Sequence, residues 1–108
     1  HMNSNPTLLS DATQAVYQAL DSVIDPELGI GIVSLGLVYD VKCQDESVQV
    51  AMTMTTPTCP LGEELREQAE AAVARLPFVK QAQVDLVWDP LWTPDRMQPA
   101  ARRALGWE

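Results

Sequence analysis

Two consecutive stretches of alternating apolar and polar residues constrain the fold of this chain more than any other feature. Residues 37–43 alternate first, residues 47–55 alternate most regularly, and only residues 44–46 connect them. Alternation is typical of a strand with one buried face, and a short connection favours antiparallel pairing. The sequence therefore predicts a β-hairpin with one apolar and one polar face.

Helical spacing flanks this hairpin on both sides. Apolar residues recur every three or four positions from residue 10 to about residue 24, and Pro26 disfavours helix immediately before it. The same spacing returns after Pro60 and continues to residue 76, where Pro77 is expected to end the helix. We therefore expect one helix before the hairpin and one after it.

A third strand is predicted over residues 82–88 and a short C-terminal helix over residues 99–105, closed by Gly106. The path from the second strand through a helix to the third resembles a crossover unit. We expect an α+β fold of two layers, in the order α-β-β-α-β-α, with the helices packed on one face of a small three-stranded mixed sheet. Whether the third strand pairs with the first or with the second stays open. Trp88 is expected to face the core by alternation, whereas Trp92, in the following loop, could line a site or contact a partner.

Length and charge limit the domain organisation and the partners. The 108 residues suffice for one domain, which we expect over residues 10–108, with residues 1–9 a tag remnant and a flexible N-terminus. The formal net charge of −8 disfavours nucleic acid and anionic membranes as partners. No apolar run approaches the roughly 20 residues that span a bilayer, and the N-terminus lacks the pattern of a secretory signal. The expected location is the cytoplasm.

Histidine chemistry is nearly excluded. His1 is the only histidine, and the pair His1-Met2 is typical of a cleaved expression tag. Without His1 the chain has no Ser–His or Cys–His pair for nucleophilic catalysis and no mixed Cys/His zinc site. A thiol enzyme is therefore the least favoured of the functions considered.

The two cysteines have different expected roles. Cys43 shares the alternation of the apolar residues in the first strand, so we expect it to fill the core as a small hydrophobe. Cys59 stands where the second strand gives way to the second helix. Pro60 is expected at the first helical position, which makes Cys59 or Thr58 the cap.

A position at the start of a helix favours the thiolate of Cys59, because unpaired N–H groups and the helix dipole stabilise an anion. Glu63 and Glu64 in the first turn act against it. A single cysteine cannot enclose an iron–sulfur cluster or a structural zinc, since either normally needs four ligands. We therefore expect any iron or cluster at Cys59 to be transient and shared with a second subunit, a small thiol, a partner protein or nearby carboxylates. No permanent cofactor is expected.

Two acidic residues and two threonines have both a functional and a structural interpretation. Asp25 and Glu27 flank Pro26 and could supply oxygen ligands or proton transfer, although Asp before Pro is also ordinary turn chemistry. Thr55 and Thr56 lie at the end of the second strand, where threonines are common. The residues themselves leave both interpretations open.

Four motifs carry a resemblance to a known family. They are DPEL at residues 25–28, IVSLGLVY at 32–39, MTMTTPTCP at 52–60 and VWDPLW at 87–92. In this order and spacing they resemble the small metal–sulfur cluster assembly family that includes SufT-like and PaaD-like proteins, also called domain of unknown function fifty-nine. The resemblance runs from about residue 11 to residue 107.

The resemblance implies the fold of the iron–sulfur cluster assembly domain and a role in maturing iron–sulfur proteins. Carried over by position, it implies that Cys59 is the reactive cysteine and the metal ligand. It also implies that Asp25 and Glu27 form an acidic pair near it. Thr55 and Thr56 match the paired threonines beside the cysteine.

Three positions depart from the family pattern. Ser34 stands where many relatives have Asp, which removes one oxygen ligand from that segment. Thr58 replaces a common Gly before Cys-Pro, and Leu91 replaces a second proline. None of these departures removes the cysteine or the acidic pair.

The expected function is that of an accessory or carrier protein for iron–sulfur cluster assembly, without turnover chemistry of its own. Cys59 would hold or hand over iron or a cluster together with a second chain or a client. The alternatives are a metal-free adaptor that recruits client apo-proteins, and an assembly subunit of a multicomponent aromatic-ring oxygenase. The expected partners are iron–sulfur assembly proteins, client apo-proteins and a second copy of the chain.

Overall fold

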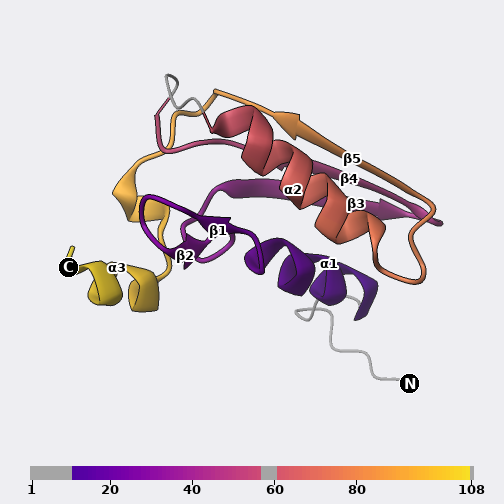
Figure 1. The fold of residues 1–108 in the computed structure, drawn as a ribbon, viewed down its shortest axis with the longest axis horizontal. Helices are drawn as coiled ribbons and strands as arrows, with labels where there is room; N and C mark the ends of the chain where they lie inside the picture. The colour runs from indigo at the N-terminus through magenta and orange to yellow at the C-terminus, as the bar shows by residue number, and fades with distance from the viewer. Residues whose placement is uncertain (1–10, 57–60, 108) are drawn as a thin grey trace.

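The computed structural model of the protein describes residues 11–56 and 61–107 (Figure 1). Its elements in chain order are α1 (Asp11–Asp21), β1 (Ile24–Asp25), β2 (Ile30–Gly31), β3 (Val38–Gln44), β4 (Ser47–Met52), α2 (Gly62–Ala74), β5 (Gln81–Leu86), the 3₁₀ turn η1 (Pro94–Arg96) and α3 (Pro99–Leu105). The expected α-β-β-α-β-α order is confirmed. The short β1–β2 pair and η1 are additions that the sequence pattern does not predict.

The main sheet has the strand order β3-β4-β5. β3 and β4 run antiparallel, with Gln44 opposite Ser47 across a tight turn. Asp45 takes a left-handed φ of 56° there, a conformation that aspartate tolerates better than most residues. β5 runs parallel to β4, so α2 is the crossover between them. The third strand therefore pairs with the second, which settles the question that the sequence left open.

α1 and α2 form the second layer, on one face of this sheet, whereas α3 lies at one end of the molecule (Figure 1). α1 packs against β3, α2 packs against β5, and the two helices contact each other. Figure 1 shows α2 running along the strands. Fully buried apolar residues from both layers make up the core, among them Val16, Leu20, Val50, Met52, Leu65, Val73 and Val84. The described residues contain no helix long and apolar enough to cross a membrane.

α1 ends at Asp21, earlier than the expected residue 24. The chain then enters a short ladder, in which the Ile32 amide donates to the Val23 carbonyl at 2.9 Å and Asp25 lies opposite Ile30. These partners come from beyond the turn that contains Pro26. Helical spacing is a local signal and does not report such pairing, which is why the predicted end was too late.

The segment after β5 folds back over the loop that leads into β3. The Trp92 indole Nε1 donates to the Leu35 carbonyl at 2.7 Å, and the Gln98 amide donates to the Ser34 carbonyl at 2.9 Å. Met97, between them, is buried in the core. Trp92 is therefore half-buried and packs inward.

The prediction for Trp88 is wrong, because its side chain is 38% exposed. β5 ends at Leu86, and the Val87 amide makes the next hydrogen bond to β4, to the Met52 carbonyl at 2.8 Å. Alternation between core and solvent holds only while a strand continues. Trp88 lies beyond the end of the strand and is free of that alternation.

Candidate functional site

Asp25 closes a tight turn with its own side chain. Its Oδ1 accepts the backbone N–H of Glu27 at 2.8 Å and of Leu28 at 3.2 Å, and its carbonyl accepts the Gly29 amide at 2.7 Å. Asp25 is 2% exposed, so these donors replace water around the carboxylate. The sequence left open whether Asp25 has a structural role in the turn. In the structure, its Oδ1 has that structural role.

Glu27 has a different environment from Asp25. Its backbone N–H belongs to the turn, whereas its side chain is exposed. The two acidic residues therefore do not form a pair of equivalent carboxylates. The Asp25 carboxylate fixes the backbone, and the Glu27 carboxylate stays available to a ligand in solution.

The threonines at the end of β4 differ in burial. Thr55 is half-buried and Thr56 is exposed. Thr53 is fully buried, its amide donates to the Leu37 carbonyl at 2.8 Å, and its hydroxyl has no hydrogen-bond partner in the described part of the chain. Alternation placed Thr53 on the polar face, so the sequence pattern gave no sign of this buried hydroxyl.

α2 begins at Gly62, with Leu61 as its N-cap. This corrects the expectation that Pro60 is the first helical residue and Cys59 or Thr58 the cap. Thr58, Cys59 and Pro60 lie outside the described residues. A leucine side chain has no acceptor for the free N–H groups of the first turn, so the described N-cap residue gives α2 no side-chain cap. Gly62 is buried, and a Cβ there would lie 3.3 Å from Cγ of Met54, so glycine permits the close approach of α2 to the end of β4.

A groove of about 290 Å³ lies between the acidic turn and the start of α2. Pro26 lines it from the turn, and Leu61 lines it from the helix. Its other lining residues are Ile24, Glu64, Leu65 and Gln68. Leu61 is the second residue after Cys59 in the sequence. The fold therefore brings the Asp25 turn and the segment that follows Cys59 to one groove.

The charges at the start of α2 are partly balanced. Glu63 accepts a hydrogen bond from Arg66 Nε at 2.8 Å, so a cation offsets its negative charge. Glu64 is exposed and faces the groove. Of the two glutamates expected to oppose a thiolate nearby, only Glu64 lacks an ion pair among the described residues.

Ser34 has a structural role. Its amide donates to Oδ1 of Asp21 at 2.9 Å, and its hydroxyl donates to Oδ2 of the same carboxylate at 3.0 Å. An aspartate at position 34 would place a second carboxylate against Asp21. The serine here fixes the loop before β3 to the end of α1.

Cys43 packs against the core, as expected, and is half-buried. The Thr13 hydroxyl lies 3.7 Å from its Sγ and donates to it. Burial raises the pKa of the nearby Tyr17 phenol, and Asp40 and then Cys43 add to this increase. The Cys43 side chain therefore lies on β3 against α1. Cys43 does not line the groove.

No group of three or more His, Cys, Asp or Glu side chains in the described ranges 11–56 and 61–107 is arranged to hold a metal ion.

The fold is shared with a solved structure. A crystal structure titled as a domain of unknown function, DUF59, from Bacillus anthracis has a TM-score of 0.84 and 37% sequence identity. The match covers 90% of this chain and 93% of that one. The two-layer fold expected from the sequence is therefore confirmed.

The chain belongs to the family of iron–sulfur cluster assembly proteins, whose pattern matches residues 13–86. The Fe-S protein maturation auxiliary factor SufT of Staphylococcus aureus (strain USA300) is 48% identical over 78% of this chain and 97% of its own length. The Fe-S protein maturation auxiliary factor YitW of Bacillus subtilis (strain 168) is 46% identical over 84% of this chain and 90% of its own length. These matches confirm the family that the four motifs indicated.

Proposed function

We propose that this chain is an accessory carrier for iron–sulfur clusters and that it acts in the maturation of iron–sulfur proteins in the cytoplasm. Cys59 holds iron or a cluster jointly with thiolates from a second chain, a small thiol or a client. The partners are the assembly proteins that supply the cluster and the apo-proteins that receive it. The chain performs no turnover chemistry of its own.

One observation carries the proposal: Pro26 of the acidic turn and Leu61 at the start of α2 line the same groove. In this proposal, cargo bound at Cys59, two residues before Leu61 in the sequence, meets the acidic turn on the opposite wall. The family membership and the maturation factors among the relatives support this use of the groove.

The residues around the groove suit a temporary site. Asp25 fixes the turn, and the exposed Glu27 carboxylate is an oxygen donor that ferrous iron accepts. In this proposal, Thr55 and Thr56 contribute hydroxyl groups from the segment that precedes Cys59 in the sequence. A full set of protein thiolates would hold a cluster permanently, whereas one thiolate leaves the remaining ligands exchangeable.

Transfer to a client is then an exchange of ligands. Each client thiolate binds an iron and displaces a thiolate that came from the carrier or from a small thiol. The displaced thiolate takes up a proton from solvent, and neither iron nor sulfur changes its oxidation state. Incomplete ligation at Cys59 favours this exchange, because few bonds to the carrier must break.

Delivery to an apo-ferredoxin tests the proposal. The chain is loaded anaerobically with ferric iron and sulfide in glutathione buffer, and formation of holo-ferredoxin is followed by visible circular dichroism. We expect faster formation than with the same iron, sulfide and glutathione alone. Cys59→Ala should remove the acceleration, whereas Cys43→Ala, the matched control in the core, should keep it. Equal rates for Cys59→Ala and the unsubstituted chain would contradict the proposal.

A further inference from the structure

β5 is an edge strand of the main sheet. β4 lies on one side of it, and no strand among the described residues pairs with the other side. The N–H and C=O of Val84 point to this open side, where both bond to side chains of α2. Backbone groups alternate in direction along a strand, so Ala82 and Leu86 face the same side. Such a row of backbone groups is a template for a further strand.

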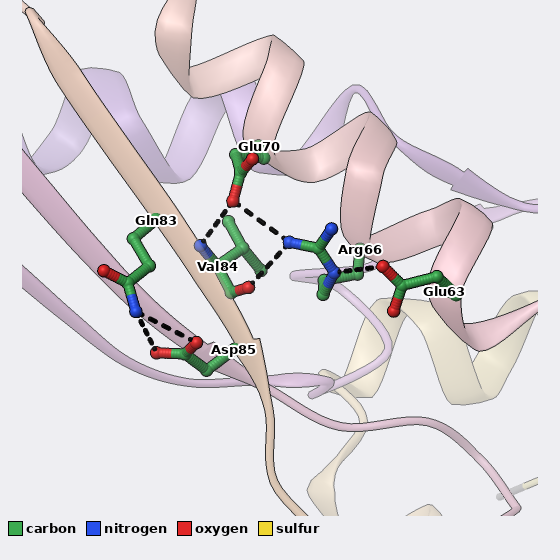
Figure 2. Close-up of polar contacts among 6 residues, drawn as sticks. All are labelled: Glu63, Arg66, Glu70, Gln83, Val84 and Asp85. Atoms are coloured by element: carbon green, nitrogen blue, oxygen red, sulfur yellow. Dashed lines mark hydrogen bonds and ion pairs between the residues drawn. The ribbon is translucent and has the colours of Figure 1, made fainter.

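Two side chains of α2 cover the middle of this edge, as Figure 2 shows. The Val84 N–H donates to Oε2 of Glu70 at 3.1 Å, and Nη1 of Arg66 donates to the Val84 carbonyl at 3.0 Å. Nη1 of Arg66 also donates to Glu70 at 3.0 Å, across one turn of helix. The pair gives Val84 one acceptor and one donor, as a neighbouring strand would. We call Arg66 and Glu70 the edge clamp.

The helix holds the edge clamp in position. Glu63 accepts from Nε of Arg66 at 2.8 Å, so carboxylates bind the guanidinium at both ends (Figure 2). The hydrogen bond that Arg66 donates to Glu63 raises the pKa of Arg66 most, loss of hydration lowers it somewhat, and the charges of Glu63 and Glu70 raise it further. The Arg66 side chain is 21% exposed. The donor that covers the Val84 carbonyl is therefore fixed and always charged.

We propose that the open edge of β5 is a self-association surface and that the edge clamp keeps it closed. Without the clamp, β5 pairs with β5 of a second copy of this chain. In an antiparallel pair centred on Val84, the backbone groups of Ala82, Val84 and Leu86 of each strand all bond to the other strand. A shifted register would pair fewer of these residues.

The chemistry of β5 permits this pairing. In the centred register, Gln83 lies opposite Asp85 of the partner subunit, so no like charges meet. In the chain itself, Gln83 Nε2 already donates to the Asp85 carboxylate at 3.2 Å, which shows that the two groups are compatible neighbours. Side-chain charge alone therefore does not protect this edge, and the edge clamp does. The proposal is independent of the role of Cys59.

Sedimentation velocity over a range of concentrations tests self-association. The double variant Arg66→Ala/Glu70→Ala should show a weight-average sedimentation coefficient that rises with concentration more steeply than that of the unsubstituted chain. Glu67→Ala is the matched control, because it removes an exposed carboxylate of α2 while the two bonds to Val84 come from Arg66 and Glu70. Adding Gln83→Asp to the double variant should reduce the rise of the sedimentation coefficient with concentration. The new carboxylate at position 83 would lie opposite the Asp85 carboxylate of the second copy, and the symmetry of the pair repeats this repulsion. A double variant that behaves like the unsubstituted chain, or a rise that Gln83→Asp does not reduce, would overturn the proposal.

Amide hydrogen exchange in the unsubstituted chain provides a test that does not depend on how well a variant folds. At low concentration, the Val84 amide should exchange about tenfold more slowly than the Ala82 amide, which faces the same edge outside the clamp. In the double variant this difference should disappear. Equal exchange of Val84 and Ala82 in the unsubstituted chain would show that the clamp does not close the edge.

Discussion

Replacement of Asp25 by alanine is expected to lower the free energy of unfolding by about 3 kcal/mol, because it leaves two amides of a tight turn without their acceptor. The acceptor is Oδ1, which binds the N–H groups of Glu27 and Leu28 in a side chain that is 2% exposed. Urea denaturation followed by far-ultraviolet circular dichroism measures the loss.

Asp25→Asn is the matched control, since an asparagine Oδ1 can accept the same two bonds. We expect it to cost about 1 kcal/mol or less. Equal losses for the two variants would show that the hydrogen bonds to the turn are not what Asp25 contributes. The asparagine variant also separates structure from cargo binding: a normal fold with slower cluster delivery would indicate that the negative charge of Asp25 contributes to the site.

Gly36→Ala should be even more damaging, with an expected loss of about 3 kcal/mol or more, since it adds a backbone clash to a left-handed conformation that itself costs about 1–2 kcal/mol. Gly36 has a φ of 77°, and a Cβ there would run into the backbone carbonyl of Arg96 in η1. The C-terminal segment would have to move off the loop that leads into β3. Thermal and urea denaturation measure the effect.

Gly29→Ala is the control for Gly36→Ala. Gly29 has a similar φ of 70°, but a Cβ there would meet no atom of the described residues within 4 Å, its two chain neighbours apart. It should therefore cost only the conformational term of about 1–2 kcal/mol. If both alanine variants lost the same stability, close packing of η1 against Gly36 would not be part of what holds the C-terminal segment in place.

The main elements were predictable because their signals are local. Alternation over residues 37–43 and 47–55 predicts β3 and β4, and helical spacing with bounding prolines predicts α1 and α2. Local signals fail where the chain leaves an element. Trp88 and Thr53 were both assigned by continuing an alternation beyond the end of its strand.

The candidate site was predictable as a set of residues and not as an arrangement. The motif at residues 25–28 identifies Asp25, but only the fold shows that Asp25 serves the turn while Glu27 faces solvent. The groove joins Pro26 to Leu61, two residues far apart in the sequence, and no spacing rule connects them. The two threonines and Cys59 remain predictions from the family resemblance.

The edge clamp illustrates the same limit. The spacing of Glu63, Arg66 and Glu70 is a familiar pattern of ion pairs on one helix. That two of these side chains bond the backbone of Val84 depends on how α2 packs against β5. The ion pair of Arg66 and Glu70 lies at the surface, where such a pair contributes little to stability. Its position over β5 nevertheless lets it control the association of that edge strand.

In the proposed function, Cys59 binds the cargo and ligands from outside the chain complete the site. Anaerobic native mass spectrometry of the chain loaded with ferric iron, sulfide and glutathione is the test. We expect iron–sulfur mass on the chain only together with glutathione or a second chain, and we expect this mass to be present in Cys43→Ala and absent in Cys59→Ala. The same iron–sulfur mass on Cys59→Ala would contradict the proposed function.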